Sequence, residues 1–117
     1  MTSHSDSLVS YFGYWPDFAD GKILELAWEA SGHLRLVIHY IDANTSKEAT
    51  VGLRFSEVTQ FLLSELRSEN VLDALVIRDG NPISVELDAC FGVQGTFNCT
   101  SFEVTFVNPN SSISPTK

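Results

Sequence analysis

Bulky apolar residues stand at every second position in several segments of this chain, and this alternation limits its fold more than any other feature. It is clearest in 34–41, LRLVIHYI, and it returns in 22–30, 49–55 and 83–91. Successive side chains of a β-strand point to opposite faces of the sheet, so a period of two predicts strands with one buried face. Such alternation is typical of antiparallel sheets.

Short turn signals separate these segments. Ser31-Gly32 joins two of the predicted strands as a hairpin, and Asp79-Gly80-Asn81-Pro82 leads into the strand that begins at Ile83. A short helix fits 5–12, where Ser and Asp offer caps and Gly13 supplies a stop. We therefore predict a mainly β fold, α+β by strict count, in which seven or eight antiparallel strands form a sandwich or a partly open barrel with one or two short helices.

Segment 56–73 fits two structures. Its apolar spacing suits a helix, whereas the alternation of Phe61 and Leu63 suits a strand. We favour a strand near 58–63 that is followed by a helical turn, and a helix through the segment is the alternative.

The register of the last predicted hairpin decides the state of the two cysteines. A two-residue loop would place Cys90 opposite Cys99, within reach of a disulfide. A three-residue loop, 93–95, would instead pair Phe91 with Phe97. Burying a Phe side chain contributes about 1.5–3 kcal/mol, so we favour the second register, in which both cysteines are free thiols.

The charge balance is strongly acidic. The chain of 117 residues holds 15 Asp and Glu against 7 Lys and Arg, which gives a formal net charge of −8 and a pI near 4.6. A protein that neutralises phosphates needs a stripe of Lys and Arg. The basic residues here are scattered singly, so we expect no nucleic-acid partner, and a basic protein is the partner that this charge favours.

The length predicts a single domain, which we assign to 1–107, and we expect 108–117 to be a flexible polar tail. No apolar run approaches the roughly 20 residues of a membrane helix. The first residues show no secretory signal. We therefore expect a cytoplasmic protein without a membrane partner, and the sequence leaves its oligomeric state open.

Few residues are candidates for catalysis or metal binding. The histidines, His4, His33 and His39, do not have the spacing of metal ligands. Asp17 and Asp20 are irregularly placed carboxylates, but an Asp beside proline or glycine is also what a turn requires. We therefore prefer turn roles for both, and we expect no catalytic residue, no metal and no cofactor, so that the chain is not an enzyme.

Residues 12–23, FGYWPDFADGKI, combine four aromatic rings, a proline and two aspartates. Pro16 fixes its own φ and Asp20 can close the backbone before Gly21, so the run suits a structural corner at the start of the first strand. The segments LRLVIHYID, VGLRFSEV and FGVQGTFNC follow in order. Together with them, the run resembles the immunity protein 50 family of bacterial polymorphic toxin systems.

The family signature is a Trp-Pro-x-Phe-His-Asp run that leads into the first strand. The matching residues here are Trp15, Pro16, Phe18 and Asp20, whereas Ala19 stands where the histidine is usual. This departure removes the one side chain of the motif that would suggest catalysis or metal binding. We therefore expect the motif residues to be structural.

The resemblance implies an immunity protein that binds a cognate toxin domain and neutralises it by steric occlusion. The residues that we propose as contacts to a basic toxin are Tyr14, Glu57, Glu65, Glu69, Asp73, Glu86 and Asp88. The alternative is a small apolar-ligand-binding β protein without catalytic activity. The rings that would line its cavity are Trp28, Tyr40, Phe55 and Phe91.

Overall fold

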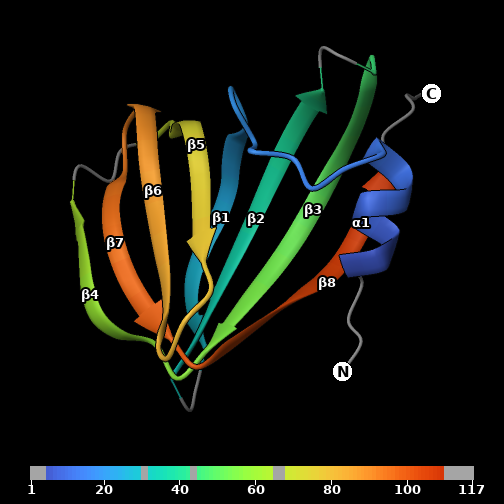
Figure 1. Ribbon diagram of the computed structural model, residues 1–117. Helices are drawn as coiled ribbons and strands as arrows, with labels where there is room; N and C mark the ends of the chain where they lie inside the picture. Colours follow the sequence, from blue (N-terminus) through green and yellow to red (C-terminus); the bar gives the residue numbers. More distant parts are fainter. Residues whose placement is uncertain (1–4, 30–31, 43–44, 65–67, 110–117) are drawn as a thin grey trace.

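The computed structural model describes residues 5–29, 32–42, 45–64 and 68–109. This part of the chain forms one short helix and eight strands (Figure 1). In chain order they are α1 (Ser5–Phe12), β1 (Lys22–Glu29), β2 (His33–Asp42), β3 (Lys47–Ser56), β4 (Thr59–Ser64), β5 (Val71–Arg78), β6 (Ile83–Phe91), β7 (Gln94–Cys99) and β8 (Ser101–Pro109). Within these ranges, no helix has the length and apolar character needed to cross a membrane.

The strands form one antiparallel sheet that does not close into a barrel. Its order is β4-β7-β6-β5-β1-β2-β3-β8. β1 pairs with β2 along its whole length but with β5 only at Lys22 and Val71, so this seam divides the sheet into two halves. In Figure 1 the half β5-β6-β7-β4 faces the half β1-β2-β3-β8. The predicted mainly β, antiparallel fold is confirmed.

The core lies between the two halves, and the alternating residues of the strands build it. Phe55 of β3 and Phe97 of β7 come from opposite halves and meet edge to face, with ring centroids 5.1 Å apart. Both rings are buried. α1 adds the buried side chains of Leu8 and Phe12. Each such side chain contributes about 1.5–3 kcal/mol on burial, so packing holds this short helix in place.

A bend at Thr100 carries the chain from one half to the other. β7 ends immediately before this residue and β8 begins immediately after it. The Thr100 amide donates a hydrogen bond to the Ser56 carbonyl oxygen at 3.0 Å, which ties the bend to the end of β3. Before the bend β7 pairs with β4, and after it β8 pairs with β3. The stretch that contains β3 and β4 therefore pairs with the stretch that contains β7 and β8 in both halves of the sheet.

The predicted register of the β6–β7 hairpin is wrong. Phe97 lies opposite Val85 and not opposite Phe91. β6 continues to Phe91, whose partner lies in β5. The last β6–β7 pair is Leu87 with Gly95, so a longer connection than the predicted three-residue turn separates the paired residues. Within this connection the Val93 amide donates to the buried Asn70 Oδ1 at 2.8 Å. Phe97 instead packs against Phe55 of β3 across the core. This contact replaces the pairing with Phe91 on which the predicted register was based.

The prediction of free thiols is confirmed. Cys90 is exposed near the end of β6, whereas Cys99 is buried at the end of β7. Burial raises the pKa of the Cys99 thiol, because a thiolate charge is costly away from water. Its partner in the β6–β7 register is Ile83, which places this thiol in an apolar environment.

Segment 56–73 contains a strand near its start. β4 spans Thr59–Ser64, which confirms the strand over this stretch. The helical turn that we expected after it falls largely on residues outside the described ranges. At the other end of the chain β8 extends to Pro109, so 108–109 belong to the sheet, and the rest of the expected tail lies outside the described residues.

Candidate functional site: an acidic hollow lined by the aromatic motif

Residues 13–21 connect α1 to β1 and run beside the end of β2 (Figure 1). Their backbone is bonded to β5. The Asp20 amide donates to the Leu72 carbonyl oxygen at 2.7 Å, and the Leu75 amide donates to the Asp17 carbonyl oxygen at 2.8 Å. These bonds place the motif at the seam where β1 meets β5, and they fix the point at which the first strand begins.

A tight turn at 18–21 shapes this connection. Phe18 and Asp20 have φ values of 63° and 64°, in the left-handed region that most residues avoid. The Gly21 amide donates to the Phe18 carbonyl oxygen at 2.8 Å, and a Cβ on Gly21 would lie 2.8 Å from the same oxygen. Phe18 is fully buried, with its ring centroid 5.2 Å from that of Tyr40, and this packing offsets the backbone strain.

A hollow of about 370 Å³ lies between this connection and the end of β2. The connection contributes aromatic and acidic side chains, and β2 contributes a further tyrosine and aspartate. The lining residues are Tyr14, Trp15, Asp17, Ala19, Asp20, Tyr40, Ile41 and Asp42. Carboxylates and aromatic faces both attract cations. Because the described residues of this lining include no basic side chain, the hollow is suited to a positively charged group.

Asp42 is buried at the base of the hollow, with 2% of its surface exposed. Tyr14 Oη donates to Asp42 Oδ1 at 2.8 Å, and Thr45 Oγ1 donates to Asp42 Oδ2 at 2.8 Å. A buried carboxylate is tolerated only when it accepts hydrogen bonds of this kind. The same bonds fix the ring of Tyr14, which is partly exposed, at the wall of the hollow.

Tyr40 reports the electrostatic character of this site. Its pKa is raised above the ordinary tyrosine value, first by burial of the ring and then by the negative charges of Asp42 and Asp17 and by the neighbouring Tyr14. The phenol therefore stays protonated, because ionisation would add another negative charge beside carboxylates. A cation that enters the hollow meets a negative potential that is only partly screened by water.

Asp17 has the turn role that we preferred from the sequence for both it and Asp20. Asp17 Oδ1 accepts a hydrogen bond from the Ala19 amide at 3.0 Å, as a turn aspartate does. Both carboxylates nevertheless line the hollow. In the described part of the chain, no group of three or more His, Cys, Asp or Glu is placed to hold a metal ion.

The motif residues are divided between the core and the hollow. Pro16 and Phe18 are buried. Trp15 and Asp20 line the hollow, and so does Ala19, which occupies the position of the family's usual histidine. The motif therefore both anchors the start of β1 and forms one wall of the candidate site.

The proposed toxin contacts are not gathered in one place. Among those that the structure describes, Tyr14 alone lines the hollow. Glu69 forms an ion pair with Lys22 at 3.0 Å, and Glu86 forms one with Arg78 at 3.2 Å. These two carboxylates are therefore partly neutralised within the protein.

The remaining acidic candidates also lie apart from the hollow. Glu57 precedes β4 and accepts a hydrogen bond from Thr100 Oγ1 at 2.8 Å. Asp73 and Asp88 are exposed in β5 and β6. Glu65 lies outside the described residues.

Sequence reasoning missed Asp42 and the part that Tyr40 plays beside it. Asp42 opens the polar stretch 42–48 between two predicted strands, and a stretch of this kind is typical of a surface connection. A usable signal was present, because residues two apart in a strand point to the same face. A carboxylate two positions beyond a buried tyrosine is therefore directed toward the same side as that ring.

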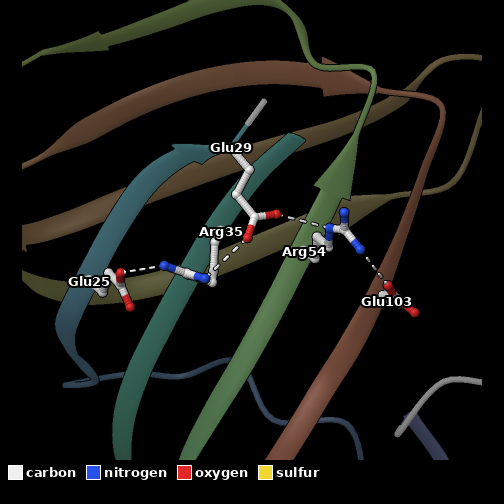
Figure 2. Close-up of polar contacts among 5 residues, drawn as sticks. All are labelled: Glu25, Glu29, Arg35, Arg54 and Glu103. Carbon is white, nitrogen blue, oxygen red and sulfur yellow. Dashed lines mark hydrogen bonds and ion pairs between the residues drawn. The ribbon is translucent and has the colours of Figure 1, made fainter. Parts of the chain in front are cut away.

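Sequence reasoning also missed a ladder of ion pairs on the sheet face of β1, β2, β3 and β8 (Figure 2). Arg35 bonds Glu25 at 2.7 Å and Glu29 at 3.1 Å. Arg54 pairs with Glu29 at 3.0 Å and lies 3.8 Å from Glu103. The hydrogen bond from Arg35 to Glu25 raises the pKa of the guanidinium. This ladder joins all the strands of one half through partly exposed side chains.

The fold and the hollow define a small, acidic, antiparallel β domain with a cation-attracting site at one end of the sheet. No protein-family model, no curated protein and no solved structure matches this chain. The resemblance to the immunity protein 50 family therefore rests on the motif residues and on the order of the segments that follow them.

Proposed function

We propose that this protein is an immunity protein that binds a cognate bacterial toxin domain and neutralises it by steric occlusion. The observation that carries the proposal is the hollow, because the residues that resemble the immunity family form one of its walls and carboxylates dominate its polar lining. A preformed site of this kind on an acidic domain is suited to one protruding basic side chain of a protein partner.

An arginine or lysine of the toxin is the group that we assign to the hollow. There it meets the carboxylates of Asp17 and Asp20 and the ring faces of Tyr14 and Trp15. A guanidinium can stack on an aromatic ring and bond a carboxylate at the same time, which an ammonium does less well. A basic side chain held in this way is removed from the toxin's own substrate, and the body of the domain covers the surrounding toxin surface.

The net charge of −8 supports fast encounter with a basic toxin. Opposite charges steer two proteins together and raise the association rate, especially at low ionic strength. Aromatic contacts act mainly on dissociation, since they are desolvated only in the complex. The acidic residues of the hollow should therefore act mainly on the association rate constant, and its aromatic residues on the dissociation rate constant.

The alternative of an apolar-ligand carrier has less support. Of the rings proposed to line a cavity, Phe55 and Tyr40 are buried in contact with other core rings. Trp28 and Phe91 are 54% and 51% exposed. The rings thus occupy separate places in the molecule, and the hollow that contains Tyr40 is lined with carboxylates.

Acid–base chemistry in the hollow is the second candidate function, because Asp17 and Asp20 share its wall. Two carboxylates that act on one substrate must lie on the same site. Stoichiometry separates this function from inhibition. An inhibitor protects only at amounts equal to the toxin, whereas an enzyme protects at a small fraction of that amount.

If a secreted protein is encoded directly upstream of this chain's gene, its C-terminal domain is the toxin to test. That domain is expressed in a bacterial host, with and without this protein, and binding is measured with the purified pair. We expect restored growth and a complex with equal amounts of both proteins. The double variant Asp17→Asn with Asp20→Asn should bind at least about tenfold more weakly, as expected for lost charge-assisted contacts.

The matched control is the double variant Glu25→Gln with Asp79→Asn, which removes the same charge from exposed positions that neither line the hollow nor belong to the proposed toxin contacts. It should slow association slightly and leave dissociation unchanged. The proposal fails if the wild-type protein does not bind the toxin domain. Protection at far less than equal amounts would instead favour the enzymatic function.

A further inference from the structure

The two edges of the sheet differ in their protection. β8 packs against α1, contains Glu103 and ends at Pro109. A covering helix, a charge and a proline are devices that keep an edge strand from pairing with another chain. β4, the other edge, has the sequence TQFLLS, without a charge or a proline. In the described part of the chain, no strand pairs with its outer side.

Apolar side chains are exposed along the β4 edge. Leu62 of β4 is 69% exposed and Phe61 is 37% exposed. Trp28 at the end of β1 is 54% exposed, and its ring centroid lies 5.0 Å from that of Phe61. We call these three residues the β4 edge patch. Trp28 and Phe61 lie side by side, and exposed apolar residues grouped in this way are typical of a contact surface.

The neighbouring apolar residues Phe61 and Leu62 point to opposite faces of β4, and a bulge interrupts the pairing of this strand with β7. The register shifts between Thr59 and Leu62, where Gln60 has a φ of 53°. Phe61 turns toward the core, with its ring centroid 6.0 Å from that of Phe97, whereas Leu62 is open to solvent. A strand added here would find apolar contacts on one face from Leu62 and on the other from Phe61 and its tryptophan neighbour.

The charges around the β4 edge patch favour a basic occupant. Glu57 precedes the strand, is exposed and forms no ion pair with a described residue. Neither β4 (TQFLLS) nor its neighbour β7 (QGTFNC) contains a basic residue. The whole chain carries −8, so a second copy is repelled and a positively charged segment is attracted.

We propose that β4 is a docking edge for an extended, basic segment of a partner protein, which adds a strand to the sheet. Main-chain hydrogen bonds to the open side of β4 provide affinity, and apolar residues at alternate positions of the segment contact the β4 edge patch. The proposal goes beyond the proposed function, because the β4 edge patch and the hollow share no residue.

The test uses three capped peptides in place of the unidentified segment. One is Lys-Val-Lys-Val-Lys-Val-Lys, the second replaces every lysine with glutamate, and the third replaces the central valine with proline. Binding is measured by titration calorimetry, and amide hydrogen exchange locates it on the protein. We expect the lysine peptide to bind and to protect the amides of 59–64, while the other two bind at least about tenfold more weakly.

The variant Leu62→Lys adds a charge at an exposed position and should weaken the lysine peptide by about tenfold. The control Val9→Lys makes the same change at an exposed position of α1 and should leave the affinity within about twofold. Equal binding of the glutamate or proline peptide would overturn the proposal. So would protection of 13–21 in place of 59–64, or a self-associated form that already protects β4.

Discussion

The contact between Phe55 and Phe97 makes a strong prediction, because it joins the two halves of the sheet. Phe55→Ala should lower the free energy of unfolding by about 3–5 kcal/mol, the usual cost of removing a fully buried ring. Phe55 is 0% exposed, and its ring centroid lies 5.1 Å from that of Phe97 and 6.1 Å from that of Phe102. A domain of this size has a total stability of about 6–18 kcal/mol, so the variant should remain folded.

A double-mutant cycle isolates the contact itself. Edge-to-face aromatic pairs contribute about 0.5–1.5 kcal/mol beyond the burial of their area. We therefore expect a coupling energy of that size between Phe55→Ala and Phe97→Ala in urea denaturation followed by circular dichroism. The cycle of Phe91→Ala with Phe97→Ala should show a coupling below about 0.3 kcal/mol, since Phe97 is paired with Val85 and not with Phe91, and Phe91 is exposed.

Two results would refute this reasoning. A loss of less than about 1 kcal/mol for Phe55→Ala would mean that the ring is not packed between the halves. A larger coupling for the pair Phe91 and Phe97 than for Phe55 and Phe97 would restore the hairpin register that the structure replaces.

Four further predictions concern single sites. Glu29→Gln should destabilise the protein more at low than at high NaCl in urea denaturation, because salt screens the ion-pair ladder. Wild-type stability should fall as the pH rises past about 10, since the raised pKa of Tyr40 lets the unfolded tyrosine ionise first; Tyr40→Phe should lose less over the same pH range. A thiol reagent should modify exposed Cys90 within minutes and buried Cys99 only after denaturation, as mass spectrometry would show. Gly95→Ala should speed amide exchange throughout β4, because the new Cβ would lie 1.9 Å from a carbonyl oxygen of that strand.

The positions of the strands could be predicted from the sequence, because they depend on local alternation. Each predicted strand appears in the structure, including the disputed one at Thr59–Ser64. The β6–β7 register was not predictable in the same way. It depends on β5 pairing with the end of β6 and on Phe97 meeting a ring from the opposite half. Both partners are distant in sequence, so no local pattern contains them.

The candidate site was predictable in part. The motif was singled out from its composition, and the turn role predicted for Asp17 is confirmed by the hydrogen bond that it accepts from the Ala19 amide. The hollow itself needs Tyr40 and Asp42, which the fold brings beside the motif from another strand. The acidic residues chosen from solvent-facing positions are dispersed because alternation identifies a face of a strand but does not bring separate strands together.

The narrow junction at Lys22 and Val71 has a mechanical consequence. Only one residue pair of β1 and β5 crosses it, and the backbone bonds of Asp17 and Asp20 to β5 reinforce it. Those two residues also form a wall of the hollow, whose opposite wall belongs to β2. A molecule that fills the hollow contacts both β2 and the residues bonded to β5, so we expect its binding to brace the joint between the two halves.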